Sequence, residues 1–592
     1  MTALSGPFPG GQAPSPWRWL STRLWWMEHA FERARASGKA EDDTRLRIFF
    51  VLALFSFAFL TLGLAATKAA LFSGLGHESD EAPPMAGARA DLVDRNGQIL
   101  AVDLVHYGLY VDPRDVSDGR ATQTALLAAL PQIAPARLEK ILAGGRREYL
   151  IGDLTPEVKA RVHDLALPGV GFEEETGRAY PLGETAAHLI GFASSDGAGL
   201  AGAERAFDGQ IRSQAGKAPV ALSIDLRVQG ALQDELEKAA EHFQVLDGAA
   251  MVVNVRTGEI LAMASYPAFD PNAPGKAEPS AMVNHAAATV YEPGSVFKVF
   301  TLAMGLDSGV TDVYRKFDVH TPLVLPGQTI HDYDKGDETL PLWEVFTHSS
   351  NIGAARMALL AGADRMERYW RAFGLYRAAP SELIESARPL VPRRMTDNAV
   401  ASMAFGHSIS VSPLTIATGM SAILNGGLYR PLTLRKLEPG QAPAPGRRVI
   451  QASTSRTMLN LMRLNATNGT GRSANIAGYR VGGKTGTATK LVNGRYNGAK
   501  KNLASFAAIF PTDGPLDEDR YYVLIMMDEP QNLPETGGFL TGGVISAPIA
   551  GKVIERIAPL LGVPRAAAVG DVPDPRKGKD DIDFSILTAG QR

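Results

Sequence analysis

Three short motifs in this chain carry side chains that together could transfer an acyl group. The first is Ser295-x-x-Lys298, the second is Ser349-x-Asn351, and the third begins at Lys484 in Lys-Thr-Gly-Thr. A serine hydroxyl can act as a nucleophile, and a lysine can remove its proton. Each pattern alone recurs by chance in a long chain. Their order and contexts together indicate an acyl-transfer site.

The first motif predicts a nucleophile and its base on one face of a helix, because residues three apart lie one turn from each other. Pro293 and Gly294 are typical of a helix start, where free N–H groups could support an oxyanion. An ordinary lysine, with a pKa of about 10.4, is charged at neutral pH. We therefore expect Lys298 to be desolvated or to lie near another cation, which Lys484 could supply. Taken alone, Ser295 could also be an ordinary capping serine.

The second motif predicts a proton relay and a substrate clamp. The hydroxyl of Ser349, if it lies near the lysine, could pass a proton to a leaving amine. The amide of Asn351 offers both a donor and an acceptor to a peptide group of the substrate. Without the other motifs, Ser-Ser-Asn would be an ordinary turn sequence.

The third motif predicts the strand that binds the substrate. It follows a strand-like run at 479–483 that contains two glycines, a sign of close approach by a ligand or another backbone. Gly486 would let an edge strand pair with an extended peptide. Lys484, Thr485 and Thr487 would hold a terminal carboxylate, and the N–H of Thr487 would be a second oxyanion donor beside that of Ser295. The alternative is an exposed strand end with a lysine.

The composition is that of a globular protein with more than one domain. The chain has 592 residues, a formal net charge of −3 and no cysteine. Nucleic acid is not indicated as a partner by this charge. The lack of cysteine excludes disulfides, thiol nucleophiles and cysteine-ligated metals.

One uncharged, apolar segment, 48–67, predicts a transmembrane helix. Twenty residues at helical rise span about 30 Å, the thickness of a bilayer core. A cleaved signal peptide is the alternative, but its apolar core and leader are usually shorter. Arg45 and Arg47 precede the span and acidic residues follow it, so the N-terminus is expected in the cytoplasm and the body outside.

The remaining segments predict a pedestal and an α+β domain. We expect a cytoplasmic tail at 1–47, a linker at 68–87, a mixed, extended module at 88–220, a second domain at 221–562 and a disordered tail at 563–592. Within the cytoplasmic tail 1–47, apolar residues at helical spacing over 17–31 suggest an amphipathic helix on the membrane or on a partner helix. A simple basic tail is the alternative. Asn96-Gly97 predicts a hairpin at 91–100 with a two-residue turn. In the second domain, strands at 248–254, 260–266, 479–482, 503–510 and 521–527 enclose helices at 296–310, 343–375 and 397–425, which predicts an antiparallel sheet packed by helices.

Together the motifs resemble those of the penicilloyl-serine transferases. Their context resembles a class B penicillin-binding protein over about residues 88 to 560. The family's pedestal signatures are matched at 89–97, where Ala90 replaces the usual glycine, at 178–181 and at 199–204. The segments 292–298, 404–407, 411–414 and 541–543 look most like the cell-division branch, the FtsI type.

This resemblance implies a peptidoglycan D,D-transpeptidase of the division septum, anchored in the inner membrane with its catalytic domain in the periplasm. It implies stem peptides ending in D-Ala-D-Ala as substrate, β-lactams as inhibitors that acylate the serine, and no metal or cofactor. An FtsW-type glycan polymerase and other divisome membrane proteins are the implied partners. The implied catalytic residues are Ser295, Lys298, Ser349, Asn351 and Lys484, and the implied substrate-binding residues are Thr485, Gly486 and Thr487.

Three alternatives remain open within this resemblance. The first is an elongation-type class B transpeptidase. The second is a hydrolase, either a D,D-carboxypeptidase or a β-lactamase, although no E-x-x-L-N string follows Asn351 to supply a deacylating glutamate. The third is a catalytically silent β-lactam sensor or scaffold, which the three intact motifs argue against.

Overall fold

The structure, a computed structural model, describes residues 29, 36, 48, 51–63, 88–333, 339–490 and 501–565. Residues 51–63 are helical with exposed side chains. Over the described ranges, no helix is both long enough and apolar enough to cross a membrane. The following parts lie outside the described residues: 49–50 and 64–67 of the predicted span, most of the tail 1–47, the linker 68–87 and the segment from 566 onward. The chain divides into two units, residues 1–83 and residues 84–592. The second unit contains all three motifs.

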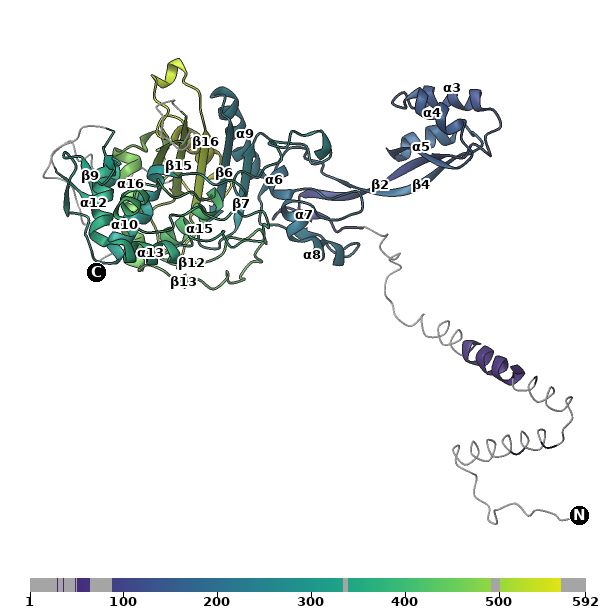
Figure 1. The fold of residues 1–592 in the computed structure, drawn as a ribbon, viewed down its shortest axis with the longest axis horizontal. Helices are drawn as coiled ribbons and strands as arrows, with labels where there is room; N and C mark the ends of the chain where they lie inside the picture. Colours follow the sequence, from purple (N-terminus) through teal and green to yellow (C-terminus); the bar gives the residue numbers. More distant parts are fainter. Residues whose placement is uncertain are drawn as a thin grey trace, which may run out of the picture. The chain divides into compact units, whose positions relative to one another are not determined.

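A five-stranded antiparallel sheet is the centre of the second unit, as the sequence predicted (Figure 1). Its order is β14-β15-β16-β6-β7, so β14 is an edge strand. The bounds are Gly482–Thr489 for β14, Asn502–Phe510 for β15, Tyr521–Asp528 for β16, Asp247–Asn254 for β6 and Ile260–Tyr266 for β7. The predicted strand at 479–482 was wrong: the strand begins at Gly482 and contains the whole Lys-Thr-Gly-Thr motif.

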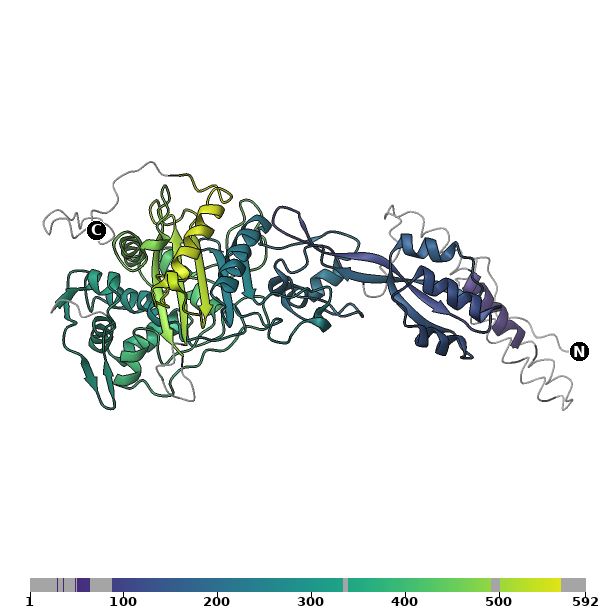
Figure 2. The same ribbon diagram turned by 90° about the horizontal axis from the view of Figure 1, so that it is seen from above.

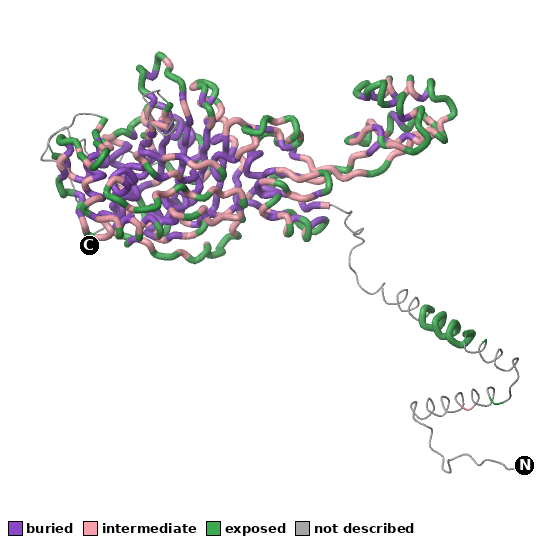
Figure 3. The backbone as a smooth tube through the Cα atoms, in the orientation of Figure 1, coloured by how far each residue is buried: buried purple, intermediate pink, exposed green. Residues whose placement is uncertain are grey.

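Helices cover both faces of this sheet (Figures 1 and 2). Alternate residues of β6, β15 and β16 pack on α9 (Leu226–His242) and α17 (Ser546–Ile557) on one face. The other face packs on a larger helical layer. Its helices are α10 (Lys298–Asp307), α11 (Leu342–Thr347), α12 (Asn351–Ala361), α13 (Ala363–Ala372), α14 (Asp397–Met403), α15 (Pro413–Leu424) and α16 (Ala452–Asn468). Figure 3 shows the buried residues concentrated along the strands and these helices.

The first motif does not lie on a regular α-helix, which corrects the prediction. Gly294–Phe297 form a 3-10 turn, η2, and α10 begins only at Lys298. In a 3-10 turn the side chains at i and i+3 eclipse each other, so Ser295 and Lys298 still point the same way. Gly294 has a φ of +59°, a conformation that other residues rarely adopt.

The module at 88–220 contains a second five-stranded sheet and a small helical lobe. Its strands are β1 (Leu92–Val93), β2 (Ile99–Val111), β3 (Glu148–Leu154), β4 (Val170–Ala179) and β5 (Val220–Ala221). The lobe packs α3 (Gly119–Ala129), α4 (Pro135–Leu142) and α5 (Pro156–His163) on β2 and β3. Short helices α6 (Ala187–Ile190), α7 (Gly202–Ala206) and α8 (Asp208–Ser213) follow.

The predicted hairpin is present, but its connection is longer than two residues. β1 and β2 pair antiparallel, and residues 94–98 form the loop between them. The carboxylate of Asp94 accepts hydrogen bonds from the backbone N–H groups of Asn96 (2.7 Å) and Gln98 (2.9 Å). This side-chain bonding stabilises the wider loop in place of a tight turn.

A buried ion network unites the pedestal signatures. Arg89 of the first signature contacts Glu204 of the third at 2.6 Å and Asp208 at 2.6 Å. Arg178 of the second contacts the same Glu204 at 2.7 Å and Asp103 at 2.9 Å. Both arginines and Glu204 are almost fully buried, so each charge is compensated by direct partners.

Candidate active site

The side chains of the first two motifs converge on the amine of Lys298. Its Nζ lies 3.0 Å from Ser295 Oγ, 3.1 Å from Ser349 Oγ and 2.7 Å from Asn351 Oδ1. It also donates to the backbone carbonyl of Ser349. Ser295 is partly exposed, whereas Lys298 is fully buried. The structure thus places an accessible hydroxyl beside a desolvated amine.

The third motif joins the same cluster. Lys484 is fully buried, and its Nζ lies 2.9 Å from Ser349 Oγ and 3.1 Å from the carbonyl of Thr485. The hydroxyl of Thr485 is 2.8 Å from that of Thr470, at the end of α16. The hydroxyl of Thr487 accepts a hydrogen bond from Gly542 N at 3.1 Å. Ser349 Oγ therefore bridges the two lysines.

Burial is the main reason that Lys298 can act as a base. Desolvation lowers the pKa of Lys298 to about 7, against the opposing charge of Asp332. The pKa of Lys484 is lowered well below its usual value, first by burial and second by the charge of Lys298. Of the two causes that the sequence left open for Lys298, desolvation or a nearby cation, desolvation is the one that lowers its pKa.

The contacts of Lys298 also fit an uncharged amine. A neutral amine has two N–H donors and one lone pair. The carbonyl of Ser349 and Oδ1 of Asn351 can only accept, so they take the two donors. The lone pair is then left for a hydroxyl proton, and the hydroxyls of Ser295 at 3.0 Å and Ser349 at 3.1 Å are both within reach of it. This arrangement prepares Ser295 for nucleophilic attack.

Asp332 anchors the second motif, a role that sequence reasoning missed. Its carboxylate accepts from the hydroxyl of Ser350 and from the N–H groups of Asn351 and Ile352, the latter at 3.0 Å. These bonds satisfy free N–H groups at the start of α12. Ser349 just before them has a φ of +60°, which is unusual for a serine. No motif spacing pointed to Asp332, which lies 17 residues before Ser349 in the chain.

We expect Asp332→Ala to lower the free energy of unfolding by about 1–2 kcal/mol, as loss of a helix cap does. It should also slow reactions of Ser295, because Ser349 would no longer be held in its strained conformation. Thermal unfolding and the rate of covalent labelling of Ser295 measure the two effects. Asp312→Ala, which removes a carboxylate that accepts from loop N–H groups at Tyr314 and Arg315, is the control for general loosening. Equal labelling rates in wild type and Asp332→Ala would contradict the assigned role.

Glycines allow β14 to approach the nucleophile segment. A Cβ on Gly294 would lie 2.7 Å from the carbonyl oxygen of Thr487, and one on Gly486 would lie 2.8 Å from that of Pro293. Gly406 packs in the same way against Gly294, at 2.1 Å from its carbonyl oxygen. The backbone before Ser295 therefore packs directly against the backbones of β14 and Gly406. This close packing sets the distance between Ser295 and β14.

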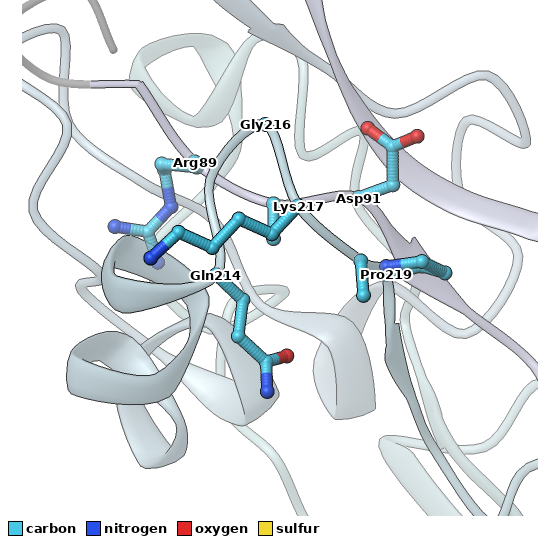
Figure 4. Close-up of a pocket in the computed structure, with 8 residues that line it drawn as sticks. Arg89, Asp91, Gln214, Gly216, Lys217 and Pro219 are labelled. Carbon is cyan, nitrogen blue, oxygen red and sulfur yellow. The ribbon is translucent and has the colours of Figure 1, made fainter. Parts of the chain in front are cut away.

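A cavity of about 220 Å³ elsewhere in the unit lacks these groups (Figure 4). It is lined by residues 89–91, 214 and 216–219, where the guanidinium of Arg89 is already engaged by Glu204 and Asp208. The nucleophile and base lie outside it. In the part of the chain that the structure describes, no group of three or more His, Cys, Asp or Glu side chains could hold a metal ion.

Comparison with known proteins gives two family matches and a series of full-length relatives. The penicillin binding protein transpeptidase domain matches residues 248–555, and the penicillin-binding protein dimerisation domain matches residues 84–242. A probable peptidoglycan D,D-transpeptidase FtsI of Caulobacter vibrioides is 52% identical over 570 residues, which cover 95% of this chain and 96% of the relative.

Two further relatives are more distant. The peptidoglycan D,D-transpeptidase FtsI of Escherichia coli K12 is 33% identical over 522 residues, or 82% of this chain and 86% of the relative. The probable peptidoglycan D,D-transpeptidase PenA of Neisseria gonorrhoeae is 31% identical over 516 residues, or 81% of this chain and 85% of the relative. All three similarities extend over both matched domains.

Proposed function

From the premise that this chain belongs to the class B penicillin-binding proteins, and to their FtsI-type branch, we propose that it is a peptidoglycan D,D-transpeptidase acting through Ser295. The observation that carries the proposal is the contact of Ser295 Oγ with the buried amine of Lys298 at 3.0 Å. The substrate class is a stem peptide ending in D-Ala-D-Ala, and β-lactams are expected to acylate the same serine.

In the acylation step, the hydroxyl proton of Ser295 moves to the lone pair of Lys298. The serine oxygen then attacks the carbonyl carbon of the penultimate D-Ala. The N–H groups of Ser295 and Thr487 are the expected donors to the oxyanion, and Asn351 holds a substrate peptide group. Lys484, Thr485 and Thr487 hold the terminal carboxylate, and Gly486 leaves room for the peptide to lie along the edge strand β14.

Collapse of the intermediate breaks the C–N bond to the terminal D-Ala, whose amine needs a proton. Ser349 Oγ lies 3.1 Å from Lys298 Nζ and 2.9 Å from Lys484 Nζ, so it can relay that proton. An amine of a second stem peptide then attacks the ester and releases Ser295. Asp332, the carboxylate whose charge acts on Lys298, accepts hydrogen bonds from Ser350 and the start of α12, so it is not placed to act as the base for hydrolysis of the ester.

The expected location of the chain in the cell follows from the same premise. The apolar segment 48–67 anchors it in the inner membrane, with 1–47 in the cytoplasm and the body in the periplasm. The pedestal spans 88–220 and the transpeptidase domain 221–562. An FtsW-type polymerase and other divisome membrane proteins are the expected partners, and the septum is the expected place of action.

The test combines chemistry and phenotype. Benzylpenicillin should add to the full-length chain at Ser295, as shown by mass spectrometry of the digested adduct, and the adduct should decay slowly. A donor peptide ending in D-Ala-D-Ala with an amine acceptor should give the transpeptidation product. Rapid β-lactam turnover would support a hydrolase instead. Depletion in cells should give filaments; round cells would place the enzyme in the elongation branch.

A further inference from the structure

A group of buried charged side chains lies at one end of the catalytic sheet, away from the three motifs. Asp247 at the start of β6 and Asp528 at the end of β16 are directly opposite each other in the antiparallel pair. The side chain of Asp528 is 3% exposed and that of Asp247 is 14% exposed. Directly opposite residues of an antiparallel pair project from the same face of a sheet, so the two carboxyl groups face each other, and the charge of Asp247 favours a proton on Asp528. We call these two residues the carboxyl pair.

The carboxyl pair is tied to the substrate-binding strand by Lys490. This residue follows β14 directly, three positions after Thr487, and its N–H continues the ladder by donating to the carbonyl of Lys501. Its Nζ lies 2.6 Å from Asp528 Oδ2 and 2.9 Å from Glu529 Oε1. To make these contacts the side chain reaches across β15 to β16. Lys490 therefore fixes the end of β14 against the centre of the sheet.

The carboxyl pair is tied to the nucleophile segment by Tyr291. The phenol donates to Asp247 Oδ1 at 2.6 Å. Tyr291 lies four residues before Ser295, and its backbone exchanges two hydrogen bonds with Val411, both of 3.0 Å. One buried pair thus contacts the two segments that border the acylation site: β14 on one side and the chain leading to Ser295 on the other.

The charges around the carboxyl pair decide when it holds its proton. Burial is the main cause that raises the pKa of Asp528 to about 6, and the charge of Asp247 adds to it, whereas Lys490 acts in the opposite direction. Burial likewise raises the pKa of Asp247. Glu529, which Lys490 and Lys501 both contact, and His285, 3.8 Å from Asp247, are the other titratable neighbours. Since the folded pKa is raised, the stabilising effect of the proton is present at low pH and is lost as the pH rises through about 6.

We propose that the carboxyl pair, through Lys490 and Tyr291, positions β14 and the Ser295 segment relative to each other, and that loss of the proton on Asp528 slows acylation. With both carboxylates ionised, two negative charges face each other across β6 and β16 in a poorly solvated place. The pair then separates or draws Lys490 and Tyr291 away from their present positions. Both movements change the width of the space between β14 and Ser295. This inference rests on the proposed acylation of Ser295.

Asp528→Asn is the decisive variant. An asparagine beside an ionised Asp247 has the same net charge as the carboxyl pair with one proton, and it keeps that charge at every pH. The measurement is the second-order rate constant for acylation of the full-length chain by a fluorescent penicillin between pH 5 and 8. We expect the rate constant of wild type, divided by that of Asp528→Asn, to fall by about threefold to tenfold from pH 5 to pH 8. A displacement well under 1 Å has an effect of that size. The titration of Lys298 cancels in this ratio.

Two further variants separate positioning from simple support. Lys490→Gln removes the cation that favours ionisation of Asp528, so the fall in the acylation rate should move to higher pH. If Lys490 had only a structural role, its loss would lower the rate equally at all pH values. Asp519→Asn is the matched control, because Asp519 pairs with Arg256 at the other end of the same two strands. Its ratio to wild type should not vary with pH. A flat ratio for Asp528→Asn would overturn this inference alone, whereas absence of any wild-type labelling would overturn the proposed function.

Discussion

Replacement of Lys298 by methionine is expected to slow acylation of Ser295 by about 10³-fold or more, because a positioned general base contributes about 10²–10⁴ in rate. The side chain of methionine fills most of the same space and needs no desolvated charge, so the fold should remain. Lys298→Arg should be as inactive as the methionine variant, since a guanidinium stays protonated and has no lone pair to offer. An active arginine variant would instead assign Lys298 a purely electrostatic role.

The pH dependence of wild-type acylation provides a second check of the same base. Only the neutral amine can accept the proton of Ser295, and burial lowers its pKa to about 7. Acylation should therefore rise as the pH increases toward 7 and level off above it, apart from the smaller effect of the carboxyl pair. The exposed Lys276→Met is the control for loss of a lysine, and its profile should match wild type. A profile that is flat from pH 5 to 8 would show that Lys298 is not the titrating base.

Gly406→Ala is the second variant with a large expected effect. Its Cβ would lie 2.1 Å from the carbonyl oxygen and 2.7 Å from the nitrogen of Gly294, and both are backbone atoms that cannot rotate away. The residue also has a φ of +81°, which disfavours alanine by about 1–2 kcal/mol. Overpacking adds about 1–3 kcal/mol, so the free energy of unfolding should fall by about 2–5 kcal/mol.

The same variant should slow acylation by about 10²-fold, since Gly294 precedes the nucleophile and a shift of about 1 Å has an effect of that size. Gly309→Ala separates the two causes. Gly309 has a φ of +67°, but a Cβ there would meet nothing within 4 Å. It should therefore lose stability through backbone strain alone and keep the wild-type acylation rate. If Gly309→Ala slowed acylation as much as Gly406→Ala, the packing argument would be wrong.

Local patterns were sufficient to predict the elements that depend on local interactions. The helix α9 begins where Asp225 accepts a hydrogen bond from Arg227 N and follows the apolar spacing of Val228, Leu232 and Leu236. The hairpin of β6 and β7 lies where strand-forming runs flank Gly258. The three motifs could be recognised because each is short and carries its own chemistry. They do meet in space: Lys298, Ser349, Asn351 and Lys484 share one hydrogen-bonded cluster.

Features set by distant segments could not be predicted. Two glycines at 482 and 483 suggested an interrupted strand, but pairing with β15 incorporates both of them, and so β14 is longer and begins later than predicted. Tertiary packing against Gly406 accompanies the 3-10 turn at Ser295 in place of an α-helix. The anchoring by Asp332 and the pairing of Asp247 with Asp528 join residues far apart in sequence. The hydrophobic periodicity of a sequence carries no information about such contacts.

The loop at 94–98 has a mechanical consequence. Besides closing its own hairpin, Asp94 accepts a hydrogen bond from Leu226 N at 3.1 Å, at the first residue of α9. The neighbouring Arg95 donates its N–H to the carbonyl of Ile224 at 2.8 Å. The same loop therefore closes the first hairpin of the pedestal and is hydrogen-bonded to the start of α9 in the next domain. A force that rotates the pedestal would act on α9, and on the sheet beneath it, through these two hydrogen bonds.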